Sequence, residues 1–128
     1  MNKLLGTMLL LLAPITACGD DETTSTTNGG DKDVSDVLPL LPNGNLMDGE
    51  QVYGESCAQT TCHGADGNTG ASASPPLSEA VPQRSDKELA EVIRYGTINE
   101  GGVMPEQTQL TAQDIADVIV FLRQQFPE

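Results

Sequence analysis

Apolar residues recur with a helical period near the C-terminal end of the chain. Four of them follow the i, i+3, i+4, i+7 spacing of an amphipathic helix, namely Ile115, Val118, Ile119 and Leu122. Thr111 precedes this stripe, and Asp114 follows three residues later at the spacing of a helix cap. We therefore expect a helix that begins after Thr111 and ends near Phe126.

Two further helices follow from the same kind of pattern. The run Ser85-Asp86-Lys87-Glu88 has the spacing of a capping box, and the apolar positions Leu89, Val92 and Ile93 follow it. Gly96 is the natural stop of that helix. An earlier helix is predicted from about Asp48 to Cys57, with Val52 and Tyr53 as its apolar anchors.

The rest of the chain shows no helical or alternating period, and no stretch predicts a strand. Residues 64–84 and 97–110 are expected to be long, irregular connections. Residues 18–45 are rich in Asp, Thr, Ser and Gly and predict a flexible acidic tether, which as a coil would span roughly 30 Å. The apolar residues at 37–41 can dock on the domain and soften its boundary. The fold is predicted to be all-α, with the folded domain at residues 46–128.

The first 17 residues read as a secretory signal peptide. Lys3 precedes an apolar run that is too short to span a membrane as a helix. The stretch Ile-Thr-Ala-Cys resembles the lipobox of bacterial lipoproteins, which implies that Cys18 becomes the lipidated N-terminus. The alternative is cleavage near Ala17 that leaves Cys18 as a free thiol. We expect a lipid-anchored protein of the bacterial envelope, on its periplasmic side or the cell surface. Gly19, where some bacteria place a retention Asp, favours the outer membrane.

The amino-acid composition argues against one class of partner and indicates a cofactor. The net charge is -13, and the 6 basic residues do not cluster, which argues against nucleic acid as a partner. The acidity either serves solubility or steers a basic partner. No Trp is present and only 3% of the residues are aromatic, so three short helices have little core to bury. A large apolar cofactor would supply that core and give the long loops a surface to wrap.

The stretch Glu-Ser-Cys-Ala-Gln-Thr-Thr-Cys-His holds the candidate chemistry. Covalent haem attachment uses two thiols and an adjacent imidazole, commonly as Cys-x-x-Cys-His. Here Cys57, Cys62 and His63 have that order, but four residues separate the cysteines, and Gln59 stands where the usual first Cys would be. A Cys57–Cys62 disulfide beside a surface His is the competing interpretation. A zinc site would lack its fourth Cys or His ligand.

Met104 is the second candidate ligand. It lies in the stretch Asn-Glu-Gly-Gly-Val-Met-Pro-Glu-Gln, flanked by Gly101, Gly102 and Pro105 and without apolar periodicity. A thioether there has little value for packing, whereas flexible glycines would let it approach a metal. A His and Met ligand pair raises the reduction potential of a haem.

Together these residues resemble the class I cytochromes c, specifically short bacterial monohaem domains. The likeness covers about residues 48–126, and its residues are Gly49, Tyr53, Cys57, Cys62, His63, Gly64, Pro75, Leu77, Gly96, Met104 and Pro105. The resemblance implies one covalently bound haem c, with Cys57 and Cys62 as attachment points and His63 and Met104 as axial ligands. It also implies that the carbonyl of Pro75, or failing that of the adjacent Pro76, accepts a hydrogen bond from the His63 Nδ1–H.

The resemblance further implies that the first and last helices cross at Gly49, with Tyr53 against Phe121 or Leu122. The expected function is one-electron transfer between redox partner proteins, by an electron carrier rather than an enzyme. One alternative is a haem sensor of gas or peroxide in which Met104 leaves the iron. Another is a haem-free lipoprotein module with a Cys57–Cys62 disulfide. Arg84, Arg94 and Tyr95 could reach haem propionates or could simply be solvated or packed.

Overall fold

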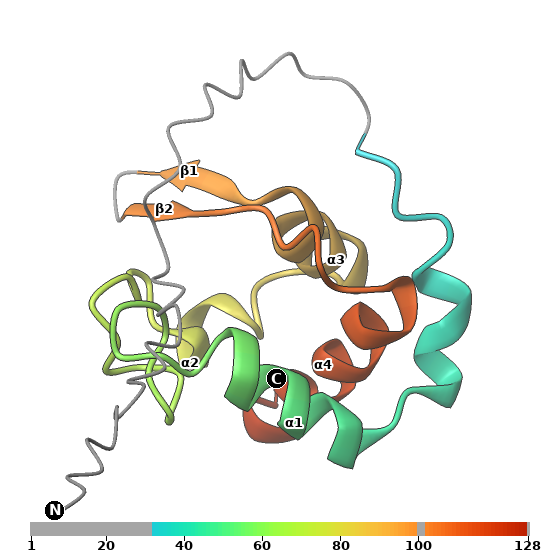
Figure 1. Cartoon of the computed structure of the whole chain (residues 1–128), viewed down its shortest axis with the longest axis horizontal. Coiled ribbons are helices and arrows are strands. Elements are labelled where there is room, and N and C mark those ends of the chain that lie inside the picture. Colours follow the sequence, from blue (N-terminus) through green and yellow to red (C-terminus); the bar gives the residue numbers. More distant parts are fainter. Residues whose placement is uncertain (1–31, 100–101, 128) are drawn as a thin grey trace, which may run out of the picture.

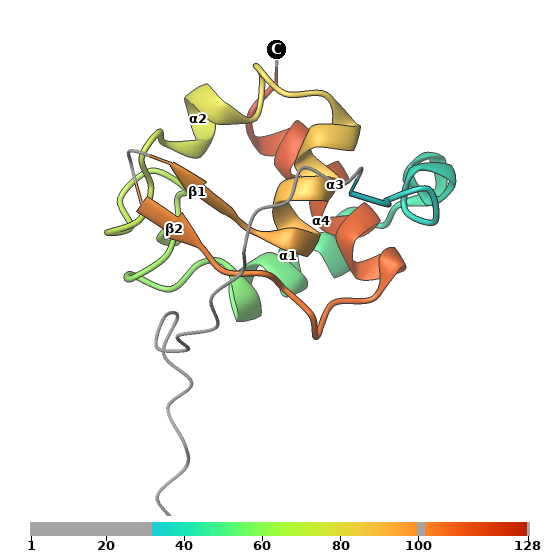
Figure 2. The same cartoon turned by 90° about the horizontal axis from the view of Figure 1, so that it is seen from above.

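A computed structural model describes residues 32–99 and 102–127, shown in Figure 1. Within these ranges five helices surround a small core, and a two-stranded hairpin extends away from the C-terminal end of α3, as Figure 2 also shows. The elements in chain order are η1 (Leu38–Asn43), α1 (Leu46–Ser56), α2 (Leu77–Ala80), α3 (Asp86–Tyr95), β1 (Thr97–Asn99), β2 (Gly102–Met104) and α4 (Ala112–Gln125). The predicted all-α class is confirmed.

The crossing of α1 and α4 forms the centre of the domain (Figure 1). Gly49 is buried there, and a Cβ atom at that position would clash with the backbone oxygen of Asp117. The ring centroids of Tyr53 and Phe121 lie 5.4 Å apart, a distance typical of a favourable aromatic pair. The crossing predicted from Gly49 and Tyr53 is therefore confirmed.

Helices α3 and α4 both begin with the capping boxes that the sequence predicted. In α3, the Ser85 hydroxyl accepts from the Glu88 N–H while the Glu88 carboxylate accepts from the Ser85 N–H. Thr111 and Asp114 repeat this exchange at the start of α4. Each box satisfies backbone N–H groups that have no partner within the helix.

The hairpin corrects the expectation that the chain has no strand. Thr97–Asn99 pairs in antiparallel register with Gly102–Met104, and Thr97 lies opposite Met104. Three-residue strands are too short for a two-residue period to become visible in the sequence. The structure therefore places Met104 on a paired strand rather than in an irregular loop.

The segment before α1 corrects the predicted domain boundary. Val34 and Val37 are buried in the core, and η1 packs on α4, so residues 32–45 are part of the folded domain rather than of a flexible tether. Asn45 caps α1 by accepting from the N–H groups of Met47 and Asp48. The predicted signal peptide and Cys18 lie outside the described residues. Across the ranges described, no helix has the length and hydropathy needed to cross a membrane.

Candidate cofactor site

An apolar pocket opens between the hairpin, the segment that follows α1, and helices α2, α3 and α4. Its cavity volume is about 80 Å³, which is smaller than the roughly 300–1,000 Å³ typical of cofactor pockets, so a large cofactor would also have to fill space at the open mouth. Cys57, His63, Pro75 and Met104 all line it, although the sequence separates them widely. The structure thus brings together four of the predicted site residues.

Aliphatic side chains make up most of the pocket wall. They come from three helices and the hairpin, and include Leu77, Val81, Leu89, Val92, Ile93, Val103, Val118 and Leu122. Such a wall disfavours water and suits an apolar group better than a small polar substrate. The expectation that a cofactor completes the thin core matches this lining.

Cys57 lies at the C-terminal end of α1, where its N–H donates to the Tyr53 carbonyl at 2.8 Å. Its thiol is free and buried, so the alternative Cys57–Cys62 disulfide is not formed. Burial raises the pKa of this thiol to about 11. The neutral thiol is a poor nucleophile, so spontaneous oxidation or metal binding at Cys57 is disfavoured.

The four residues between the cysteines form a compact loop that closes on itself. The His63 N–H donates to the Cys57 carbonyl at 3.1 Å, and the Cys62 N–H donates to the Gln59 carbonyl at 2.9 Å. Cys62 is buried, and it directly precedes His63, which lines the pocket. The longer spacing is therefore accommodated by local hydrogen bonds, and it does not displace His63 from the pocket.

Gly70 packs directly against the backbone of Cys62 and His63. The sequence alone did not predict this contact. A Cβ atom on Gly70 would clash with the Cys62 carbonyl oxygen, and the Gly70 N–H donates to the His63 carbonyl at 3.1 Å. The Tyr53 hydroxyl adds a buried bond of 2.8 Å to the carbonyl of Gly64. A Gly within an irregular stretch gave no signal of this contact, because the contact depends on how the loop folds back.

The imidazole of His63 is half-buried, and burial lowers its pKa. A lowered pKa favours the neutral ring, which is the form that ligates metals. Its Nδ1 atom is buried and has no hydrogen-bond partner among the described residues. The predicted bond from Nδ1 to the Pro75 carbonyl is therefore not made in this structure, although Pro75 lines the same pocket.

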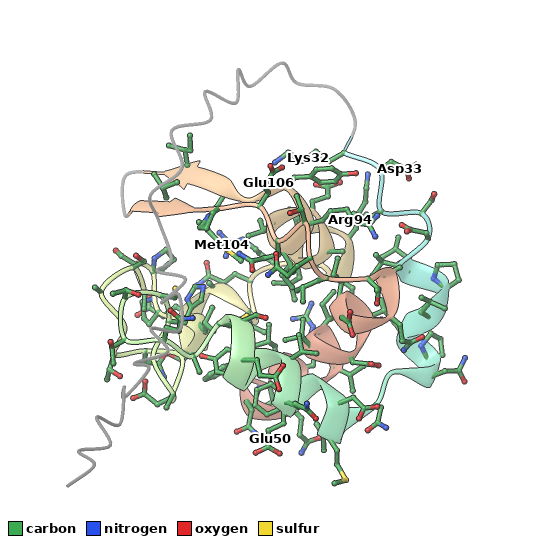
Figure 3. All side chains as sticks on the ribbon, viewed as in Figure 1. Lys32, Asp33, Glu50, Arg94, Met104 and Glu106 are labelled. Atoms are coloured by element: carbon green, nitrogen blue, oxygen red, sulfur yellow. The ribbon has the colours of Figure 1, made fainter. Side chains whose placement is uncertain are left out.

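Met104 is half-buried at the end of β2 and borders the pocket (Figure 3). Its backbone is backed closely by Gly96, which has a φ of 68°. A Cβ atom at Gly96 would clash with the Met104 carbonyl oxygen. Gly96 thus serves twice, as the end of α3 and as the surface against which the Met104 backbone packs.

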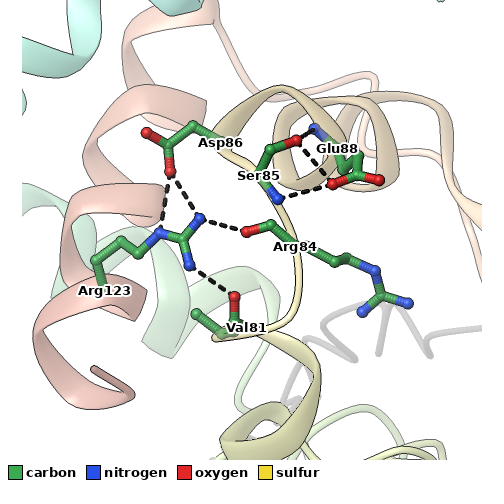
Figure 4. Close-up of polar contacts among 6 residues, drawn as sticks. All are labelled: Val81, Arg84, Ser85, Asp86, Glu88 and Arg123. Atoms are coloured by element: carbon green, nitrogen blue, oxygen red, sulfur yellow. Dashed lines mark hydrogen bonds and ion pairs between the residues drawn. The ribbon is translucent and has the colours of Figure 1, made fainter. Parts of the chain in front are cut away.

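Arg123 ties the α2–α3 side of the pocket to α4 (Figure 4). Its guanidinium donates to the carbonyls of Val81 and Arg84, and pairs with the Asp86 carboxylate at 2.9 Å. Val81 and Arg84 both line the pocket, so this clamp fixes part of its wall. Among the described residues of the lining, Arg84 is the one with a permanent positive charge.

Arg94 and Tyr95, the other candidates for a carboxylate partner, are engaged elsewhere. Arg94 pairs with Asp36, and the Tyr95 hydroxyl donates to the Asp33 carbonyl. Neither belongs to the described residues that line the pocket.

The donor set favours a haem over a bare metal ion. Within residues 32–99 and 102–127, no group of three or more His, Cys, Asp or Glu side chains could hold a metal ion, which leaves the zinc alternative without support. An imidazole and a thioether border one apolar pocket, and a buried thiol lines it. These are the groups that bind a haem through its iron and its side chains.

Comparison with known proteins agrees with this site. A family model described as cytochrome c oxidase, cbb3-type, subunit III matches residues 44–122. The match runs from just before α1 to near the end of α4 and includes every described residue of the pocket lining. No curated protein and no solved structure matches the chain significantly.

Proposed function

The chain belongs to the family of cytochrome c oxidase cbb3-type subunit III, and from this membership we propose that it carries single electrons between redox partners by means of one haem. The family is one of class I c-type cytochrome domains, whose cofactor is covalently bound haem c. When bound, the haem iron supplies a reversible one-electron couple. The protein itself contributes binding, orientation and the exclusion of water.

We assign the roles of Cys57, His63 and Met104 from the geometry of the pocket, and that of Cys62 from its place in the sequence motif, since Cys62 is not among the described lining residues. Cys57 and Cys62 would form the thioether links, and His63 and Met104 would be the axial ligands. The observation that supports this assignment is the convergence of Cys57, His63 and Met104 on one apolar pocket from the end of α1, the following loop and β2. Because His63 and Met104 would both hold the iron, a substrate would first have to displace one of them, which is why we propose a carrier rather than a catalyst.

The environment of the pocket favours a stable ligand set. Burial lowers the pKa of His63 and so favours its neutral form, and the hydrogen bonds of Gly70 and Tyr53 fix the carbonyls of His63 and Gly64. Gly96 and the β1–β2 pairing fix the backbone of Met104. Little rearrangement would then accompany each change of oxidation state, which favours rapid electron transfer.

We further propose that the domain is held at a bacterial envelope membrane by lipid on Cys18, and preferentially at the outer membrane. The sequence pattern around Ala17 and Cys18 supports this part of the proposal. The family description names an oxidase subunit, so an oxidase-type electron acceptor is the first partner class to test.

The test is the absorption spectrum of the full chain after export and maturation. We expect a Soret band that remains with the protein after acid–organic extraction, because the haem would be covalently attached. In the ferrous protein, carbon monoxide should bind slowly and weakly, since Met104 would have to leave first. No Soret band would refute the haem function, and rapid, tight carbon monoxide binding would favour the sensor alternative.

A further inference from the structure

The N-terminal strap, which we define as residues 32–43, is held on the last residues of α3. The Arg94 guanidinium reaches both oxygens of the Asp36 carboxylate, at 2.6 and 2.9 Å, and also donates to the Asp33 carbonyl at 3.1 Å. A bidentate ion pair of this kind is stronger and more directional than an ion pair with a single hydrogen bond. Arg94 therefore contacts the strap at two residues.

Neighbouring contacts extend this attachment. The Tyr95 hydroxyl donates to the Asp33 carbonyl at 2.7 Å, and the Lys32 ammonium donates to the Gly96 carbonyl at 3.3 Å. Lys32 also lies 5.9 Å from the centroid of the Tyr95 ring, within reach of a cation–π contact. Figure 3 shows Lys32, Asp33 and Arg94 gathered at this end of α3. Each residue from Arg94 to Gly96 thus contacts the strap.

The strap is also anchored by apolar burial. Val34 is 2% exposed and Val37 is fully buried, and both belong to the same core cluster as the side chains of α4. Burial of this kind holds the strap in one position, so that the polar contacts of Arg94 act on a fixed partner. A flexible tether would offer no such partner.

Arg94 and Gly96 also contact the segment that carries Met104. This segment comprises strand β2 and the three residues that follow it (residues 102–107), and we call it the Met104 loop. A Cβ atom at Gly96 would clash with the Met104 carbonyl oxygen, and the Gln107 N–H donates to the Arg94 carbonyl at 3.3 Å. Gln107 is buried, and its side-chain amide donates to the Pro105 carbonyl at 3.1 Å. The end of α3 is therefore enclosed between the strap and the Met104 loop.

We propose that Arg94 is a positioning residue for Met104: by holding Asp36 and Asp33 of the strap, it fixes the end of α3 against which the Met104 loop packs. The role of the Met104 sulfur as an iron ligand rests on the proposed function, whereas the mechanical coupling does not. A force that lifts the strap would release this support. The strap is thereby coupled to Met104, which borders the pocket.

The first test is amide hydrogen exchange of the full chain as purified, read over residues 97–107. In Arg94→Gln we expect the amide exchange of these residues to become roughly tenfold faster, because the bidentate ion pair with Asp36 is lost. Arg123→Gln is the matched control, since it breaks another Arg–Asp pair at Asp86, the opposite end of α3 from the Met104 loop. Its exchange over 97–107 should stay within about twofold of wild type. Unchanged exchange in Arg94→Gln, or an equal increase in both variants, would overturn the proposal.

Asp36→Asn provides a milder variant, because it leaves the Arg94 bond to the Asp33 carbonyl in place. It should also make amide exchange over residues 97–107 faster. In the double variant Asp36→Asn/Arg94→Gln, the change in the free energy of exchange should be smaller than the sum of the changes in the two single variants. Full additivity would show that the pair does not act as a unit and would overturn the proposed route.

The second test uses the haem-loaded protein and exogenous imidazole, which competes with the thioether for ferric iron. Imidazole should bind to Arg94→Gln with a Kd lower by roughly tenfold than wild type, because Met104 is held less firmly. An unchanged Kd would contradict the positioning role. If the matured chain carries no haem, the proposed function is refuted. Hydrogen exchange would still test whether Arg94 supports the Met104 loop.

Discussion

Two glycines show how a single residue positions the site. Gly49 lets α1 touch α4, and Gly70 lets the following loop touch the Cys62–His63 backbone. The first was predictable, because a Gly inside a helix costs stability unless a close contact requires it. The second was not, because irregular segments contain Gly for many reasons and its partner is set only by the folded loop.

Gly49→Ala should therefore destabilise the domain. The added methyl would clash with the backbone oxygen of Asp117, and backbone in a helix cannot move aside cheaply. We expect a loss of about 1–3 kcal/mol in the free energy of unfolding, measured by urea titration. Gly54→Ala is the matched control in the same helix, since a Cβ atom there meets nothing within 4 Å. It should leave stability unchanged or raise it by up to about 1 kcal/mol; similar losses in both variants would contradict the crossing.

Cys57 allows a second prediction at this scale. If it forms a thioether across the four-residue spacer, Cys57→Ala should reduce the yield of covalently bound haem but leave a single link at Cys62. Cys62→Ala should leave the link at Cys57 alone. Mass spectrometry of the matured chains, with and without reduction, reads both outcomes. Wild-type yield in Cys57→Ala would show that Cys57 is not an attachment point.

At the scale of elements, the helices that the sequence predicted are those with a long sequence pattern. The two capping boxes and the stripe of α4 extend over many residues, and the helices begin where these patterns placed them. The hairpin strands, η1 and α2 are three to six residues long, too short for periodicity to identify. Their positions follow from tertiary contacts, such as those of the strap with α3 and α4.

The capping box of α3 predicts a pH dependence. The Ser85 hydroxyl and N–H both donate to the Glu88 carboxylate at 2.7 Å and lower its pKa below the ordinary value of 4.5. A carboxyl whose pKa is lower in the folded state stabilises the protein above its ordinary pKa of 4.5, and this contribution is lost as pH falls through the folded value. Glu88→Gln should thus have a lower Tm than wild type at about pH 7, and the difference should shrink as the pH falls below that ordinary pKa. A difference that stays constant between about pH 7 and pH 3 would contradict this role.

At the scale of the whole molecule, the sequence identified the chemical groups better than their arrangement. Cys57, His63, Pro75 and Met104 stand out in the amino-acid sequence alone, and all four line one pocket. Three features of the arrangement were not predictable: the strand that carries Met104, the strap that packs on α3, and an Nδ1 of His63 with no partner among the described residues. None of these leaves a local pattern, because each depends on segments that are far apart in the chain.

Since the pocket replaces much of a conventional core, the cofactor should contribute to global stability. Without it, the wall formed by α3 and α4 side chains such as Leu89, Ile93 and Leu122 would lose its apolar contacts with the cofactor. We therefore expect the double variant Cys57→Ala/Cys62→Ala, expressed without covalent haem, to unfold at a lower temperature than the matured wild type. In a domain of this size, a loss of about 2 kcal/mol lowers Tm by roughly 8–16 °C.

Thermal unfolding followed by far-ultraviolet circular dichroism measures this shift. The α1–α4 contact at Gly49 lies outside the pocket lining, so helical content at low temperature should persist in the double variant. Loss of the cofactor would then weaken the packing of α3 and α4 side chains around the pocket while the helix crossing is retained. An unchanged Tm would show that the helices alone form a sufficient core, because the cofactor would then add nothing to the free energy of unfolding.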